Sequence, residues 1–263
     1  MRFRAIALAL SRALFGMDLA LPDFPRLKSV RGLGISDSDT YAGRLENRFH
    51  YTNTFYHREP SFDLARPDEG EFGIYDFVIC SEVLEHIPPP VDRAFQTLAR
   101  LLKPAGVLIL TMPYSLDEST VEHFTDLGES GLAEINGRTV LVSRTGDGRY
   151  EVFDQLVFHA GQGSTLEMRV FSEGAIRALL TAAGLTAVRF DTTGNRSFGV
   201  VYAGPCSLTI VAAREPISLG AGGIAELTGQ WTAAQALLGK VKESRWVRLG
   251  RLLGLGPDLR RRD

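Results

Sequence analysis

The chain has 263 residues, of which 44% are hydrophobic and 23% are charged. This composition is typical of one large globular domain, or one domain with extensions, and it excludes a mainly disordered, collagen-like or disulfide-rich chain. The 29 basic and 31 acidic residues leave a net charge of −2, so no global field favours nucleic acid as a partner.

The N-terminal segment predicts a helix. Arg2 and Arg4 precede the apolar run AIALAL, a pattern that amphipathic helices share with signal peptides. Arg12 interrupts the run, no clean cleavage site follows, and the run is too short to span a membrane. We therefore favour an amphipathic helix over a signal peptide and assign residues 1–28 to an N-terminal helical extension.

Strand-like and helix-like segments alternate through the middle of the chain. Apolar residues recur at every fourth position over residues 39–49 and predict a short amphipathic helix. A second helix is expected to begin near Pro90 and to stop at the sequence KPAG of residues 103–106. Apolar or β-rich runs predict four strands, at residues 28–35, 50–56, 74–80 and 107–112.

The second half continues this alternation. Ser172 is expected to cap a helix that ends at Gly184. Two more strands are predicted at residues 185–190 and 207–212, and an inserted β-hairpin at about residues 136–160. The order predicts an α/β fold over residues 29–215, a doubly wound, Rossmann-like, mostly parallel sheet in three α/β/α layers. Ligands are then expected outside the carboxyl ends of the strands.

Residues 216–263 predict a basic helical tail. Three apolar residues share one helical face, and three arginines largely oppose them: Trp246, Leu249 and Leu253 against Arg245, Arg248 and Arg251. Such a helix is typical of docking on its own domain or self-association, which we favour, and of weak contact with an anionic membrane surface.

The stretch Tyr75–Pro113 reads as strand, turn, helix, stop and strand. It contains Tyr75-Asp76, the sequence SEVLEH at residues 81–86 and the sequence LKPAG at residues 102–106. In these features it resembles the class I S-adenosylmethionine-dependent methyltransferases (methyltransferase type 11-like), which typically carry an FD-hydrophobic strand, S-x-V-L-x-H and L-K-P-G-G. The resemblance implies a methyltransferase fold that binds S-adenosyl-L-methionine.

The resemblance also implies residues that contact the cofactor. The family has an acidic residue about thirteen positions before the aspartate of the FD pair, and Asp63 precedes Asp76 by 13. The Asp63 carboxylate or the backbone at Leu64 is therefore expected to accept from the adenine amine. The alternative is a loop aspartate that caps its own turn. The residues that end the strand at 74–80 are also expected to face the cofactor: Cys80, Ser81 and Glu82.

The glycine-rich first loop of the family, G-x-G-x-G, is degenerate in this chain. Its one candidate is RGLGISD at residues 31–37. If this segment is the first strand and loop, Gly32 and Gly34 replace the cradle and one strand is lost downstream. If it is the second strand, Asp37 substitutes for the ribose-binding acid, and the first strand is absent or formed by residues 1–28. We favour the second register.

Glu82, Glu85 and His86 form the pattern E-x-x-E-H and would share one face of a helical turn. Two carboxylates and an imidazole can ligate Mg²⁺, Mn²⁺ or Zn²⁺, with His123 as a fourth ligand, and some methyltransferases bind metal at a similar pattern. The residues after this strand normally face the cofactor in the family, which gives Glu82 a competing role. We therefore expect no metal.

His86 and His123 are the candidates for the catalytic base, because imidazole titrates near neutral pH. Tyr114 follows the Met-Pro turn, where substrate or cofactor is expected, and is a third catalytic candidate. Cys80 also fits the role of a small buried apolar residue. His159 is more typical of a hairpin end than of catalysis.

The predicted function is methyl transfer from S-adenosyl-L-methionine to a small-molecule or saccharide acceptor, with no nucleic acid involved. The alternative is a non-catalytic binding or scaffolding module that has lost the cofactor cradle. A dehydrogenase is disfavoured because no strand–GxGxxG–helix unit occurs. The two cysteines, Cys80 and Cys206, suit a reducing compartment, so the predicted location is the cytoplasm.

Overall fold

The computed structural model describes residues 1–125, 127–159, 165–202, 204, 208–215 and 221–252. Contacts divide the chain into two compact units, Met1–Ser218 and Leu219–Asp263. The N-terminal segment lies within the first unit, although the sequence predicted it to be an extension.

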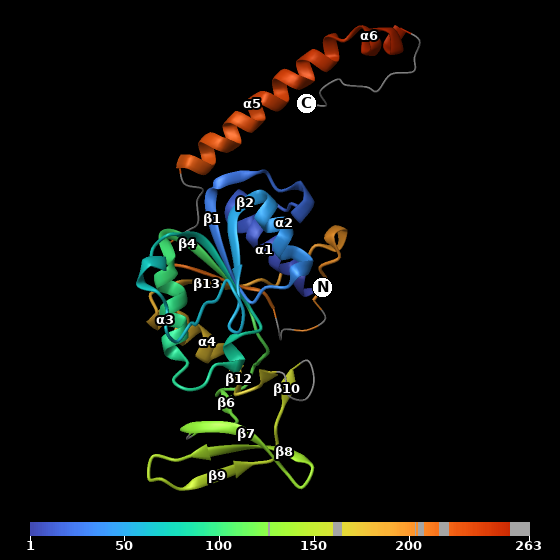
Figure 1. Cartoon of the computed structure of the whole chain (residues 1–263). Helices are drawn as coiled ribbons and strands as arrows, with labels where there is room; N and C mark the ends of the chain where they lie inside the picture. Colours follow the sequence, from blue (N-terminus) through green and yellow to red (C-terminus); the bar gives the residue numbers. More distant parts are fainter. Residues whose placement is uncertain (126, 160–164, 203, 205–207, 216–220, 253–263) are drawn as a thin grey trace. The chain divides into compact units, whose positions relative to one another are not determined.

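The first unit is built on one six-stranded sheet, with the strand order β13-β14-β4-β3-β1-β2 (Figure 1). Neighbours among β1 to β4 are parallel, and β13 and β14 are antiparallel to their neighbours. The strands are β1 (Leu27–Ile35), β2 (Phe49–Thr54), β3 (Tyr75–Ser81), β4 (Leu102–Thr111), β13 (Ala187–Phe190) and β14 (Ile210–Ala213). The mostly parallel α/β sheet predicted from the sequence is confirmed.

Helices cover both faces of this sheet. One face carries α1 (Arg2–Phe15) and α2 (Asp39–Arg48), and the other carries α3 (Asp92–Leu101) and α4 (Glu173–Ala182) (Figure 1). The predicted cap of α4 is confirmed, because the backbone N–H of Ala175 donates to Ser172 Oγ at 3.1 Å. The three-layer arrangement follows from alternation along the strands, which turns apolar side chains to both faces.

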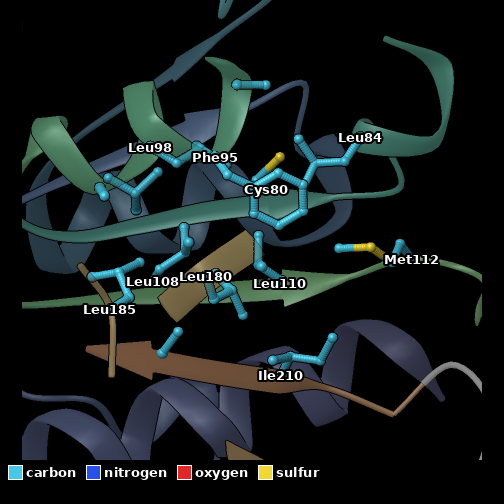
Figure 2. Packing of buried hydrophobic residues seen from close by; sticks show 14 of the residues in the cluster. Cys80, Leu84, Phe95, Leu98, Leu108, Leu110, Met112, Leu180, Leu185 and Ile210 are labelled. Carbon is cyan, nitrogen blue, oxygen red and sulfur yellow. The ribbon is translucent and has the colours of Figure 1, made fainter. Parts of the chain in front are cut away.

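The main hydrophobic core lies between the sheet and the helices α3 and α4 (Figure 2). Phe95 and Leu98 of α3 and Leu180 of α4 pack there against Leu108 and Leu110 of β4. Cys80 is buried in the same cluster as a free thiol, which confirms its role as a small buried apolar residue. Burial also raises the pKa of the thiol.

The register that we favoured for residues 31–37 is wrong. Gly34 of β1 pairs with Asn53 of β2 on one side and with Ile79 of β3 on the other, so β1 is a central strand. In the doubly wound order 3-2-1-4-5, the strand between the second and the fourth is the first, so β1 is the first strand and the missing strand lies downstream. An isolated parallel bridge between Phe55 and Ser61 stands beyond β2, where that strand would be.

Residues 103–106 belong to β4, although the sequence predicted only a helix stop there. Helix α3 ends at Leu101 and β4 begins at the next residue. The register of β3 and β4 shifts between the pairs Tyr75–Leu102 and Phe77–Val107, which absorbs the intervening residues. Gly106 is required at this irregularity, because an added Cβ would lie 2.8 Å from the Tyr75 carbonyl oxygen.

The insertion is larger than the predicted hairpin. It is a three-stranded antiparallel sheet of β7 (Glu129–Ile135), β8 (Arg138–Arg144) and β9 (Tyr150–Phe153) (Figure 1). The sequence missed β7 because that strand is exposed on both faces and shows no alternation. Short strands flank the insertion: β5 (Tyr114–Ser115), β6 (Val121–Glu122), β10 (Phe158–His159), β11 (Thr165–Leu166) and β12 (Arg169–Ser172).

The second unit consists of α5 (Ala221–Glu243) and α6 (Arg245–Leu252) among its described residues. Trp246 and Leu249 are exposed on α6, and Leu253 lies outside the described residues. No helix within the described residues is both long and apolar enough to cross a membrane.

Candidate functional site

Two strand ends in the middle of the sheet carry unusual backbone. Ser36 follows β1 with φ 57°, and Glu82 follows β3 with φ 56°. Ile35 and Cys80 are paired across the two strands, so both turns lie at the same carboxyl edge. Residues other than glycine rarely adopt the left-handed region, and such outliers cluster at functional sites.

Gly32 and Gly34 lie beneath aromatic side chains of the neighbouring strands. A Cβ added at Gly32 would lie 2.1 Å from Cζ of Phe77, and one added at Gly34 would lie 2.0 Å from the hydroxyl of Tyr51. The two rings stack with centroids 5.9 Å apart. The glycines therefore make room for Phe77 and Tyr51, and their predicted cofactor contact stays a prediction.

Asp37 is buried at the end of β1 in a polar network. Tyr41 donates to Asp37 Oδ1 at 2.6 Å, and the Tyr51 hydroxyl donates to Oδ2. Asn53, near the end of β2, accepts from the Asp37 N–H at 2.9 Å and donates to its carbonyl at 2.8 Å. Burial raises the pKa of Asp37 to about 7 against these two tyrosine hydrogen bonds.

Glu82 carries a carboxylate that its protein partners satisfy only in part. Its Oε2 forms an ion pair with Arg2 of α1 at 3.0 Å. Its Oε1 is buried and has no hydrogen-bond partner in the described part of the chain. A buried acceptor without a donor is destabilising, so this oxygen is suited to a donor or a positive charge on a ligand.

The remaining candidates for cofactor binding occupy varied environments. Asp63 Oδ1 accepts from the Ala65 N–H at 2.8 Å, so the carboxylate does cap its own turn. Leu64 is buried in the main core. The Ser81 hydroxyl shares a 2.7 Å hydrogen bond with the hydroxyl of Thr111. The adenine contact predicted for Asp63 and Leu64 stays a prediction.

A histidine and glutamate cluster lies beyond the end of β3. Glu85 and His86 sit on the short 3-10 helix η3 (Leu84–His86), and His159 ends β10. The centroids of the His86 and His159 rings are 4.7 Å apart, and the rings meet edge to face. Glu85 Oε1 lies 3.6 Å from His86 Nε2 and 3.7 Å from His159 Nδ1. Glu82 precedes η3 and is not among the three residues whose ligand atoms converge, although we predicted that it would share a helical face with Glu85 and His86.

Glu167 links this cluster to His123. Its Oε2 accepts from His159 Nε2 at 2.8 Å, and its Oε1 accepts from His123 Nε2 at 2.9 Å. Glu85 is fully buried, and burial raises its pKa to about 8. Burial also lowers the pKa of His86. Two predicted catalytic histidines, His86 and His123, are thus brought into one network.

Arg169 holds this network against β6 and η3. Its Nε donates to Glu122 Oε1 at 2.7 Å, and one guanidinium nitrogen donates to the Ile87 carbonyl at 2.6 Å and the Leu84 carbonyl at 3.3 Å. Its side chain is only 1% exposed. Tyr114, the third catalytic candidate, is buried in the main core with its ring edge-on to Phe190.

Glu167 and Arg169 complete this network and had no role predicted from the sequence. His159 was predicted only as a hairpin end, which its pairing in β10 with β11 confirms. A signal was present, because HAGQGSTLEMR at residues 159–169 concentrates polar side chains around glycines. The stretch at residues 160–164 lies outside the described residues. Only the pairing of β10 with β11 and of β12 with β6 brings these side chains to η3.

The carboxyl edge of the sheet fits the cofactor that the sequence motifs imply. The turn at Ser36 has the backbone shape that glycine supplies in the family's first loop. Glu82 offers an oxygen on the neighbouring strand end that has no partner among the described residues. A hollow of about 380 Å³ opens near the end of β2 and is lined in part by Asp39, Asn53 and Arg58.

Comparison with known proteins gives one family match. The model of a methyltransferase domain family matches residues 30–189. No curated protein matches the chain.

Several solved structures are similar to this chain. The 1,6-didemethyltoxoflavin-N1-methyltransferase of Burkholderia thailandensis has 16% sequence identity, with 79% of this chain and 77% of that chain covered and a TM-score of 0.43. DesVI of Streptomyces venezuelae has 19% identity, with 80% and 92% covered and a TM-score of 0.41. CalS10 of Micromonospora echinaspora, an amino pentose methyltransferase, has 19% identity, with 80% and 90% covered and a TM-score of 0.40.

Proposed function

Because this chain belongs to the methyltransferase domain family, in its class I S-adenosylmethionine-dependent form, we propose that it methylates a small-molecule or saccharide acceptor. The family match over residues 30–189 carries this proposal. The central position of β1 supports it, because the first strand of the family then ends next to β3 at one carboxyl edge.

Three groups at this edge would hold the cofactor. The backbone of the Ser36–Asp37 turn would face it, Glu82 would place a carboxylate near its α-ammonium group, and Asp63 would accept a hydrogen bond from the adenine amine. When bound, S-adenosylmethionine supplies an activated methyl group, so the protein mainly has to position donor and acceptor. Arg2 would orient Glu82 through the ion pair between the two side chains.

His123 is the base that the contacts support best. Its Nε2 donates to Glu167, which fixes the ring and leaves Nδ1 to accept a proton from the acceptor. Its side chain is 26% exposed, so it is accessible to a substrate. A small acceptor is supported by the net charge of −2, which provides no field for a polyanion.

The second candidate is a binding or scaffolding module that keeps the fold without catalysis. Its support is the close packing at Gly32 and Gly34, where Phe77 and Tyr51 occupy the space over β1. The two functions differ in one measurable property, which is binding of the cofactor.

We expect calorimetric titration of the full chain with S-adenosylhomocysteine to show binding to one site. Glu82→Gln should weaken binding about 10-fold or more, because it removes a partly buried carboxylate that would face the ammonium group of the ligand. The matched control is Glu215→Gln, which neutralises an exposed residue shortly after β14, at the opposite edge of the sheet. Absence of heat at millimolar ligand would refute the methyltransferase proposal and favour the binding module.

Asp63→Ala should weaken binding of the same ligand by about 1–3 kcal/mol if the carboxylate accepts from the adenine amine. Asp63→Asn keeps an oxygen that can accept from the Ala65 N–H, so it preserves the turn while altering the acceptor. Dissociation constants and melting temperatures of both variants are measured together. An unchanged dissociation constant in Asp63→Ala would show that Asp63 serves only its turn.

A further inference from the structure

Three potential ligand atoms converge beyond the end of β3. They are Glu85 Oε1, His86 Nε2 and His159 Nδ1, and all three lie within 4.8 Å of one another. At a tetrahedral centre with bonds of about 2.0–2.1 Å, neighbouring ligand atoms are about 3.4 Å apart. The distances of 3.6 and 3.7 Å from Glu85 to the two imidazoles are close to this spacing.

The other nitrogen of each imidazole already has an acceptor. His86 Nδ1 lies 2.9 Å from the Leu166 carbonyl oxygen, which can only accept, so the proton of this ring is on Nδ1. His159 Nε2 donates to the Glu167 carboxylate at 2.8 Å. In the neutral rings the lone pairs are therefore on His86 Nε2 and His159 Nδ1, the two atoms that face Glu85. Metal-binding histidines are oriented by such outer partners.

Among the described residues, no contact of Glu85 explains why a carboxyl group is buried at this position. Its side chain is fully buried, and neither carboxylate oxygen has a hydrogen-bond partner there. The approaches of 3.6 and 3.7 Å to the imidazoles are too long for hydrogen bonds. A buried carboxylate without donors is strongly destabilising unless a proton or a metal cation neutralises it. The imidazole nitrogens of His86 and His159, at 3.6 and 3.7 Å from Glu85, provide the further ligands that a metal cation requires.

We propose that Glu85, His86 and His159 bind one Zn²⁺ ion, with Glu167 and the Leu166 carbonyl as outer partners. Two imidazoles and one carboxylate form a ligand set that zinc accepts, and it leaves a fourth position open for water or another oxygen ligand. Mg²⁺ is disfavoured because it prefers oxygen ligands. The sequence alone predicted no metal, because Glu82 was expected to face the cofactor. No local pattern indicated that His159 would lie beside Glu85.

The test uses the full chain without an affinity tag, stripped of metal by a chelator and titrated with Zn²⁺ against a chromogenic competitor. We expect one Zn²⁺ per chain. Glu85→Gln and His159→Ala should each bind more than about 100-fold more weakly, beyond the effect of an outer partner. Co²⁺ in place of zinc should give visible absorption bands in the wild type that both variants lose.

His50→Ala and His57→Ala are the matched controls, since both remove exposed histidines outside the cluster. They should retain the wild-type affinity. Glu167→Gln keeps all three ligands and should weaken binding about 10–100-fold through His159. Affinities that fall from the two controls to Glu167→Gln and then to the ligand variants indicate a specific site. Adventitious binding to surface imidazoles would not give this order.

Two results would overturn the proposal. One is a wild-type affinity no tighter than that of His159→Ala, and the other is an equal loss in the His50→Ala control. If Glu85→Gln does not fold, His159→Ala carries the test, because that side chain is 31% exposed. The titration contains no S-adenosylmethionine, so its outcome is independent of the proposed methyl transfer.

Discussion

Arg169→Met is expected to lower the free energy of unfolding by about 3–5 kcal/mol. The side chain is almost fully buried, and the substitution removes its ion pair with Glu122 and its hydrogen bonds to the carbonyls of Leu84 and Ile87. Methionine fills much of the apolar space of the arginine stem but offers no donor. Its former partners are then left without compensation, and buried acceptors without donors are destabilising.

Urea unfolding of the wild type and the variant measures this effect. The matched control is Arg177→Met, which removes a partly exposed ion pair with Glu173 on α4. Exposed pairs of this spacing contribute less than about 1 kcal/mol. Equal losses in the two variants would contradict a structural role for Arg169 at η3. A second expected result is weaker Zn²⁺ binding in Arg169→Met, because Glu85 and His86 lie between the two carbonyls that Arg169 holds.

Asp37 is expected to make the protein less stable as the pH rises from about 4 to about 7. Its pKa is about 7 in the folded chain against an ordinary value of 3.8, because burial disfavours the charged form. Between these values the folded state binds more protons than the unfolded state, so the free energy of unfolding falls with pH. The expected loss is on the order of 4 kcal/mol, and it is complete above the folded pKa.

Asp37→Asn isolates this contribution. The asparagine oxygen can still accept from Tyr41 or Tyr51 but does not ionise, so the decline between pH 4 and 7 should be smaller by the amount above. Asp39→Asn, which changes an exposed carboxylate nearby, should keep the wild-type decline. Denaturant midpoints at pH 4 and pH 8 provide the comparison, because this range spans most of the expected loss. An unchanged pH dependence in Asp37→Asn would show that Asp37 is ionised in the folded protein across this range.

The sequence by itself determined the elements whose signal is local. The apolar run at residues 107–112 predicted a buried strand, and β4 contains most of it. Ser172 predicted the start of α4, because a side-chain cap acts within three residues. The motifs of Tyr75–Pro113 also indicated the methyltransferase family, because the family pattern is a run of adjacent residues.

Only the tertiary structure decided which strand β1 would be. Its pattern of apolar residues and glycines is compatible with an edge or a central strand. The neighbouring strands come from distant parts of the chain, so the residues of β1 do not indicate how many neighbours it has. The stacking of Tyr51 and Phe77 over Gly32 and Gly34 resolves the ambiguity, because it requires neighbours on both sides.

The histidine and glutamate cluster was likewise decided by the tertiary structure. Glu85 and His86 are adjacent in sequence. Glu82 adopts a left-handed backbone conformation, and its side chain forms an ion pair with Arg2. His159 reaches Glu85 only through the pairing of short strands beyond the insertion. Spacing along a chain predicts which residues share a helical turn, whereas convergence of distant side chains depends on packing that no local pattern encodes.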